Sequence, residues 1–226
     1  MTTDFFQKKR WIYIGLAGLF TAFALFCCSY AGYLRRVERV WHGRSFYFLV
    51  STNMHTEAAT QALRLDGGAG YAFSYVGQGY VAWAVYLKES DGLTVQASML
   101  ENADLLTVSI PYLYLKTRTE KSKRSIIEGA LSSFYGCIEV LSRCIVKLDE
   151  GGTQERCCQI LTVLNRQFSH LEDVYRESYA KFSKVCAEIG KAITGLVKDT
   201  IFSKDLRYLL CSACEAYIEL TSAFTI

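Results

Sequence analysis

The sequence of 226 residues predicts an α+β protein with one amino-terminal transmembrane helix. An uncharged run at residues 11–34 is long enough to cross a membrane. Residues 46–115 alternate between strand-like and helix-like patterns, and residues 116–226 carry long helical periodicity. We therefore expect five segments, which are an amino-terminal flank 1–10, the span 11–34, a juxtamembrane linker 35–45, a sheet module 46–115 and a helical bundle 116–226.

The predicted span runs from Trp11 to Leu34 without a charged residue. As a helix this run covers about 36 Å, whereas the hydrocarbon core of a bilayer is about 30 Å thick. A cleavable signal peptide is the competing interpretation, but the run is longer than a typical signal core and no small-x-small motif precedes Arg35. A lipoprotein signal needs a small residue where Phe26 stands before Cys27. We expect one uncleaved span.

The side of the membrane on which the rest of the chain lies stays open. Three Lys/Arg precede the span and four follow it closely, so the positive-inside rule does not decide. A short flank before the span and a large remainder after it are typical of proteins whose amino terminus lies in the cytoplasm. The carboxy-terminal part would then be extracytoplasmic. The nine cysteines point the other way, because the seven beyond the span cannot all pair. An odd set of thiols favours the cytoplasm or an anaerobic host.

The net charge of +3 is unevenly distributed along the chain. Residues 45–115 hold two Lys/Arg and six Asp/Glu, which gives this section a charge of −4. Residues 1–44 hold seven Lys/Arg and two Asp/Glu, so the membrane flanks are basic. Duplex binding needs a concentrated basic surface to neutralise phosphates. We expect the membrane, and no nucleic acid, as a partner.

The sheet module is predicted to follow the order β-α-β-β-α-β, the ferredoxin-like arrangement. Runs rich in aromatic and β-branched residues predict strands, and apolar residues at helical intervals predict helices. Gly67 and Gly68 end the first helix, and Pro111 places the last strand at a sheet edge. The expected elements are strand 46–51, helix 55–65, strand 71–76, strand 80–87, helix 90–100 and strand 105–113.

The two middle strands are expected to form a hairpin with a three-residue loop at Gly77–Gly79. This loop would pair Tyr75 with Val81 and Phe73 with Trp83, so that the bulkier side chains share one face. We expect that face to lie beneath the two helices of the module. The smaller, tyrosine-edged face should then be open to solvent or a ligand.

The remainder is predicted to form a three-helix, coiled-coil-like bundle. Apolar residues from Ile127 to Leu148 recur at steps of four and three, which is a three-heptad seam. Gly151 and Gly152 end this helix. A second long helix continues to Leu196, with a change of winding or a bend near Tyr175 and Tyr179. A third helix begins at Ser203, and short connections make the neighbours antiparallel.

A βαββαβ unit of this size just beyond an amino-terminal span resembles the SPOR (sporulation-related repeat) domain of bacterial envelope proteins. The resemblance is carried by Phe46–Ser51, by helix 55–65 with its alanines, and by Tyr80–Tyr86 leading into helix 90–100. It covers about a third of the chain and rests on element order more than on signature residues. It implies a helix-free sheet face that binds peptidoglycan glycan strands, and a role in sporulation or division.

The open face differs from the SPOR pattern, because Leu49 and Ala84 stand where family members usually have polar Gln or Arg. Aromatic side chains can still stack on sugar rings, and an apolar, small-residue face equally suits a protein partner. The binding residues that we predict on this face are Tyr47, Leu49, Ser74, Tyr80, Ala84 and Tyr86.

No motif in the sequence predicts catalysis, a metal or another cofactor. Cys211 and Cys214 have CxxC spacing, but they sit within a heptad helix without further ligands, so packing is the favoured interpretation. Gly67–Gly70 follows a helix, whereas a phosphate-binding loop precedes one. The histidines are scattered. We expect a non-catalytic protein that assembles through its bundle, by self-association or with a protein partner.

Two functions are expected first, and ligand sensing by the ferredoxin-like module is a third that stays open. The first is a single-pass envelope protein with an extracytoplasmic SPOR-like module that binds glycan or a protein. The alternative is a cytoplasmic-facing membrane scaffold that assembles through its helical bundle, in which the sheet is a spacer.

Overall fold

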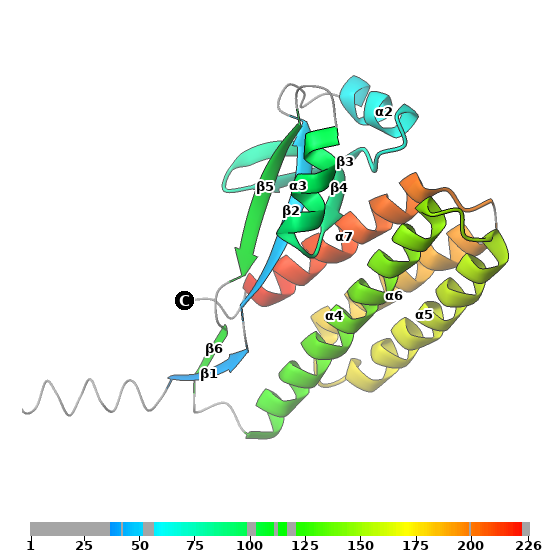
Figure 1. Cartoon of the computed structure of the whole chain (residues 1–226). Coiled ribbons are helices and arrows are strands. Elements are labelled where there is room, and N and C mark those ends of the chain that lie inside the picture. Colours follow the sequence, from blue (N-terminus) through cyan, green and yellow to red (C-terminus); the bar gives the residue numbers. More distant parts are fainter. Residues whose placement is uncertain are drawn as a thin grey trace, which may run out of the picture.

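The structure is a computed structural model that describes residues 37–41, 43–51, 57–98, 103–110, 113–116, 121–198 and 200–222. The predicted span 11–34 lies outside the described residues. Within them the predicted α+β class is confirmed, with a four-stranded antiparallel sheet and six helices. Figure 1 shows the sheet lying beside a bundle of long helices.

The four-stranded sheet has the order β3-β4-β2-β5, and every neighbouring pair is antiparallel. The edge position predicted for the last strand is confirmed. Phe46, Phe48, Leu49 and Val50 in the central strand β2 are all buried, which means that both faces of the sheet are covered. The elements of this part are β2 (Arg44–Ser51), α2 (Glu57–Leu65), β3 (Tyr71–Tyr75), β4 (Gln78–Tyr86), α3 (Glu89–Ser98) and β5 (Ala103–Ile110).

The β3–β4 hairpin has a two-residue turn, so the predicted three-residue loop is wrong. Val76 and Gly77 occupy the turn with φ of 50° and 75°. Positive φ at both central residues matches the twist of the flanking strands, although a β-branched residue rarely adopts it. Phe73 therefore pairs with Tyr80, and not with Trp83.

The bundle contains four helices, so the predicted three-helix bundle is wrong. The expected second helix is broken after Tyr175, where Tyr175 and Tyr179 both pack against Phe182 at ring centroid distances of 5.1 and 5.6 Å. The chain reverses there, so that α6 packs against α5. The helices are α4 (Lys121–Asp149), α5 (Gln154–Tyr175), α6 (Ala180–Val197) and α7 (Ser203–Ser222).

One hydrophobic core joins the sheet to the bundle. Phe46 of β2 meets Tyr217 of α7 edge-on, with ring centroids 5.7 Å apart. Phe134 of α4 lies at the centre of the bundle, where its ring contacts Phe168 and Phe182 at 5.6 and 5.7 Å. The sheet face that carries Phe46 is therefore covered by α4 and α7.

Polar contacts also tie the sheet part to α7. Arg64 of α2 forms an ion pair with Asp205 at 2.6 Å, and the Tyr71 hydroxyl donates a hydrogen bond to Glu215. These contacts lie about three turns apart along α7. They hold the sheet along much of α7.

A second, two-stranded ribbon stands apart from the main sheet (Figure 1). It is formed by β1 (Val37–Trp41) and β6 (Leu113–Lys116), which pair antiparallel with Val37 opposite Lys116. The predicted linker 35–45 is wrong for the first of these segments, because β1 forms there. The ribbon brings the start and the end of the sheet part together, and β1 also contacts α4.

One helix among the described residues, Ser125–Asp149 within α4, is long and apolar enough to cross a membrane. Half of this segment is buried inside the folded body, and the core helix of a soluble protein meets the same criterion. Its buried residues include Phe134, Ile138 and Leu141. We assign it to the bundle core.

Candidate functional site

Four of the six predicted binding residues lie on the sheet face that carries α3. Tyr47 pairs with Tyr86, and Leu49 pairs with Ala84. A Cβ on Gly92 of α3 would lie within 3.4 Å of Tyr86, so this helix presses directly on the face. Leu49 and Ala84 are buried, at 0% and 3% exposure. The expectation that this face is open is wrong.

The other two predicted residues lie away from these four. Ser74 is exposed near the β3–β4 turn. Tyr80 pairs with Phe73 and therefore lies on the face toward the bundle, where its hydroxyl donates a hydrogen bond to Gln78 at 2.7 Å. The six residues do not form one surface, and their role in binding stays a prediction.

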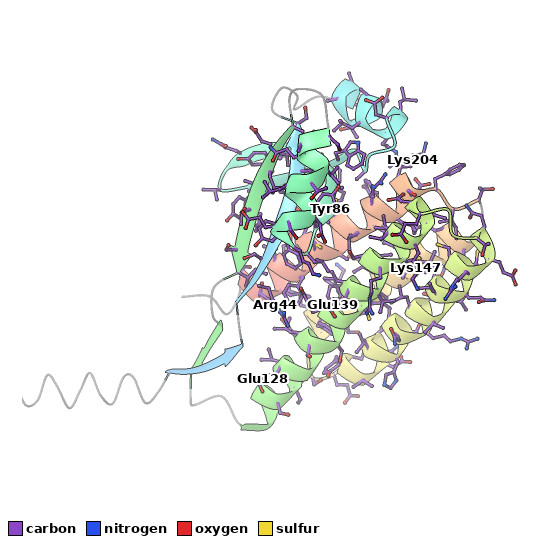
Figure 2. All side chains as sticks on the ribbon, in the orientation of Figure 1. Arg44, Tyr86, Glu128, Glu139, Lys147 and Lys204 are labelled. Atoms are coloured by element: carbon purple, nitrogen blue, oxygen red, sulfur yellow. The ribbon has the colours of Figure 1, made fainter. Side chains whose placement is uncertain are left out.

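A cleft of about 910 Å³ instead lies between the sheet part and the bundle, and we name it the Trp83 cleft. Its walls come from the end of β4, from α3, from α4 and from the start of α7. Figure 2 shows Tyr86 on the sheet side and Glu139 on α4. The residues that we use to describe it are Trp83, Tyr86, Asp91, Tyr135, Glu139, Ser142, Arg143, Asp149 and Arg207.

Arg207 is the central polar residue of the Trp83 cleft. Its guanidinium carbon lies 4.4 Å from the ring centroid of Trp83, and it donates hydrogen bonds to Gly67 O at 2.6 Å and to Asp149 at 2.7 Å. Asp149 also accepts a hydrogen bond from Ser203 at 2.5 Å. This side chain therefore links the loop after α2, strand β4 and the end of α4.

The phenols of the cleft remain protonated at neutral pH. Burial raises the pKa of Tyr86 to about 12, and nearby Arg207 only partly opposes this rise. Burial also raises the pKa of Tyr135, while Arg44, stacked 4.2 Å from its ring centroid, lowers it. Both hydroxyls can therefore donate a hydrogen bond to a ligand.

The lining of the cleft is suited to binding a ligand. Aromatic rings, a serine hydroxyl and charges of both signs line one concave surface, a combination that suits a polar ligand with apolar faces. Within the described residues, no group of three or more His, Cys, Asp or Glu side chains could hold a metal ion. The absence of catalysis stays a prediction.

The seven cysteines among the described residues are free thiols. Cys211 and Cys214 are fully buried in α7, and burial raises the pKa of both, which disfavours the reactive thiolate. The Sγ atoms of Cys144 and Cys157 lie 3.2 Å apart between α4 and α5. The predicted packing role fits these positions.

Replacing Arg207 should loosen the cleft. The Arg207→Met variant loses the contact with Trp83 and both hydrogen bonds, and we expect its free energy of unfolding to fall by about 2 kcal/mol. Tryptophan emission should shift to the red as Trp83 becomes hydrated. Denaturant titration followed by fluorescence measures both effects. The matched control is Arg166→Met on the exposed side of α5. Equal stability of the two variants would contradict the linking role of Arg207.

The residues at the centre of this site are not among those that the sequence predicts. Asp149 and Arg207 are 58 positions apart and stand in ordinary helical patterns, so no local signal connects them. The continuous apolar run Phe46–Val50 does carry a signal, because a strand buried on both faces predicts a second layer of helices. Comparisons with family models, with curated proteins and with solved structures give no match.

Proposed function

We propose that this protein is a non-catalytic, single-pass membrane protein that binds cell-wall glycan in the Trp83 cleft. The observation that carries the proposal is the joining of aromatic rings and hydrogen-bonding groups in one accessible concavity. Sugar rings offer an apolar face for stacking and hydroxyls for hydrogen bonds. The cleft provides partners for both.

The arrangement of the sheet supports a ferredoxin-like module. Its strand order β3-β4-β2-β5, with α2 and α3 on the two crossovers, is the order that a split βαβ unit gives. A SPOR-like site on the sheet face that carries Phe46 is less favoured, since α7 lies against that face and Tyr135 of α4 contacts Phe46. The Trp83 cleft is therefore the better place for a glycan. A role in sporulation or division stays a prediction from the resemblance.

Glycan binding can be tested with the full chain in mild detergent and purified peptidoglycan. We expect the protein to sediment with peptidoglycan stripped of its stem peptides, and Ser142→Trp to abolish this by filling the cleft. Ser132→Trp, on the exposed side of the same helix, is the matched control. Sedimentation that Ser142→Trp leaves unchanged, or none at all, would remove the cleft from this function.

The membrane anchor requires a separate measurement. If residues 11–34 span the bilayer, the chain stays with the membrane fraction after washing with alkaline carbonate. Release into the supernatant would contradict the anchor. This result does not depend on what the cleft binds.

The alternative function is a cytoplasmic-facing scaffold that assembles through the bundle. The observation in its favour is that the seven described cysteines form no disulfide, which suits a reducing compartment. Six of these thiols are buried, so an impermeant thiol reagent needs an introduced target. Ser169→Cys on exposed α5 should react in intact cells if the bundle is extracytoplasmic, and only after permeabilisation if it is cytoplasmic. Thr3→Cys should show the opposite behaviour.

A further inference from the structure

A tight turn joins α4 to α5 and sets the register in which the two helices face each other. α4 ends at Asp149 and α5 begins at Gln154, and the helices run side by side in opposite directions (Figure 1). Gly151 takes a φ of 87°, and the Gly152 amide donates a hydrogen bond to Lys147 O at 2.8 Å, as in a Schellman cap. A Cβ on Gly152 would lie 2.5 Å from this oxygen, so the turn requires glycine there.

Cys144 of α4 and Cys157 of α5 face each other close to this turn. Their Sγ atoms lie 3.2 Å apart, and both side chains are buried, at 2% and 4% exposure. The sulfur atoms of a disulfide are about 2.0 Å apart, so a displacement of about 1 Å brings this pair to bonding distance. A bond between them would cross-link the two helices.

A small hollow of about 20 Å³ lies beside the two thiols, and Cys144 and Cys157 are among its lining residues. The lining also includes Lys147, Thr153 and Arg156, which are exposed, so the hollow reaches the surface. A volume of this size holds about one water molecule. Hydrogen peroxide is little larger than water, whereas a molecule such as glutathione disulfide is far too large to enter. The hollow therefore favours a small peroxide as the oxidant.

The two thiols differ in how readily they ionise. Burial raises the pKa of both, and that of Cys144 reaches about 12. The hydrogen bond between the thiols contributes to the rise at Cys144 but lowers the pKa of Cys157. Because the thiolate is the form that attacks an oxidant, Cys157 is the attacking sulfur. Cys144 is then placed to react with the oxidised Cys157.

We propose that Cys144 and Cys157 are a modification site at which hydrogen peroxide forms a disulfide that locks α4 to α5. The Cys157 thiolate first attacks one oxygen of the peroxide, so that the O–O bond breaks, hydroxide leaves and Cys157 becomes a sulfenic acid. The Cys144 sulfur then attacks the Cys157 sulfur. The S–O bond breaks, and the hydroxyl leaves as water with the proton of the Cys144 thiol.

The reaction balances without a further reactant. The proton that Cys157 releases on ionising neutralises the hydroxide from the first step. Two thiols and one peroxide therefore give one disulfide and two molecules of water, with both sulfur atoms oxidised and both peroxide oxygens reduced. The new bond joins positions that are 13 residues apart and restrains the end of α4, where Asp149 accepts the hydrogen bond from Arg207.

The test uses the full chain in mild detergent, first reduced and then treated with hydrogen peroxide. Free thiols are alkylated under denaturing conditions, and the chain is digested with trypsin without a reductant. We expect the peptides 144–147 and 157–166 to be recovered mainly as a joined species, lighter than their sum by the two hydrogens that are lost. Peptide 208–226 carries the fully buried Cys211 and Cys214, and it should be alkylated at both positions.

Single substitutions identify the thiols that take part. Peptide 157–166 also carries Cys158, which is only partly buried. Cys158→Ser, the matched control, should still give the joined species, whereas Cys144→Ser and Cys157→Ser should not. Oxidation should also raise the thermal midpoint of Cys158→Ser by about 5 to 10 °C, because the bond closes a loop, and should leave that of Cys144→Ser unchanged.

Three results would overturn the proposal. The first is recovery of Cys144 and Cys157 in alkylated form after peroxide treatment of a chain that melts cooperatively. The second is a joined species in Cys157→Ser, which would assign the bond to Cys158. The third is an equal rise of the thermal midpoint in Cys158→Ser and Cys144→Ser. None of these results bears on glycan binding or on the membrane anchor.

Discussion

Raising the pH from 9 to 11 is expected to destabilise the protein strongly, because its buried thiols ionise at a higher pH in the folded state than in the unfolded chain. Burial raises the pKa of Cys137 to about 11 and that of Cys144 and Cys186 to about 12, from an ordinary value of 9.0. Below pH 9 the thiols are protonated in both states, and their contribution to stability is complete. Above pH 9 the unfolded chain releases protons that the folded chain retains, so stability is lost until the pH reaches the folded pKa values.

The free energy of unfolding should therefore fall steeply within this window. Each such thiol contributes a slope of up to about 1.4 kcal/mol per pH unit, and several act together. Urea titrations at pH 7.5, 9, 10 and 11 measure the effect. Cys186→Ala removes one thiol and should reduce the slope by that amount. A free energy of unfolding that is constant up to pH 11 would show that these thiols are not buried as described.

Replacing Phe134 with alanine should cause the largest loss among single substitutions. Phe134 is fully buried and its ring meets Phe168, Phe182 and Tyr217, which come from the other three helices of the bundle. Removing a buried phenylalanine leaves a cavity and costs about 3 to 5 kcal/mol. This is a large share of the stability of an ordinary domain, which is about 5 to 15 kcal/mol.

The same substitution tests whether the sheet and the bundle unfold together. Because the core is continuous through Phe46 and Tyr217, we expect sheet and helix signals to be lost in one transition at a lower denaturant concentration. Circular dichroism and tryptophan fluorescence follow the two parts. Leu65→Ala, at a position with 86% exposure, should change stability by less than about 0.5 kcal/mol. A sheet that keeps its original midpoint in Phe134→Ala would contradict the shared core.

The parts of the fold that depend on local patterns could be predicted from the sequence. The α+β class, the heptad helix that became α4 and the edge position of β5 all follow from periodicity or from a single residue type. The hairpin register could not be predicted, because it depends on Val76 adopting a positive φ. A shift of register changes which side chains share a face, and the assignment of faces failed with it.

Contacts between distant segments account for the remaining differences. The sequence predicts that the module uses only its own two helices, whereas α7, together with Tyr135 of α4, covers the face that they leave bare. The break after Tyr175 reflects the packing of two tyrosines on Phe182. The Trp83 cleft depends on Arg207 reaching Asp149 and Gly67, which no spacing rule relates to one another.

The geometry of the β1–β6 ribbon determines how the molecule responds to mechanical tension. Val37 and Lys116 lie at the same end of the ribbon, one leading to the amino-terminal segment and the other to α4. A force that separates these two residues acts first on the hydrogen bonds at this end of the ribbon, so the hydrogen bonds between β1 and β6 break one after another. The two strands of the ribbon should therefore separate at low force. This lengthens the connection between the amino-terminal segment and the folded body, while the sheet and the bundle keep their shape.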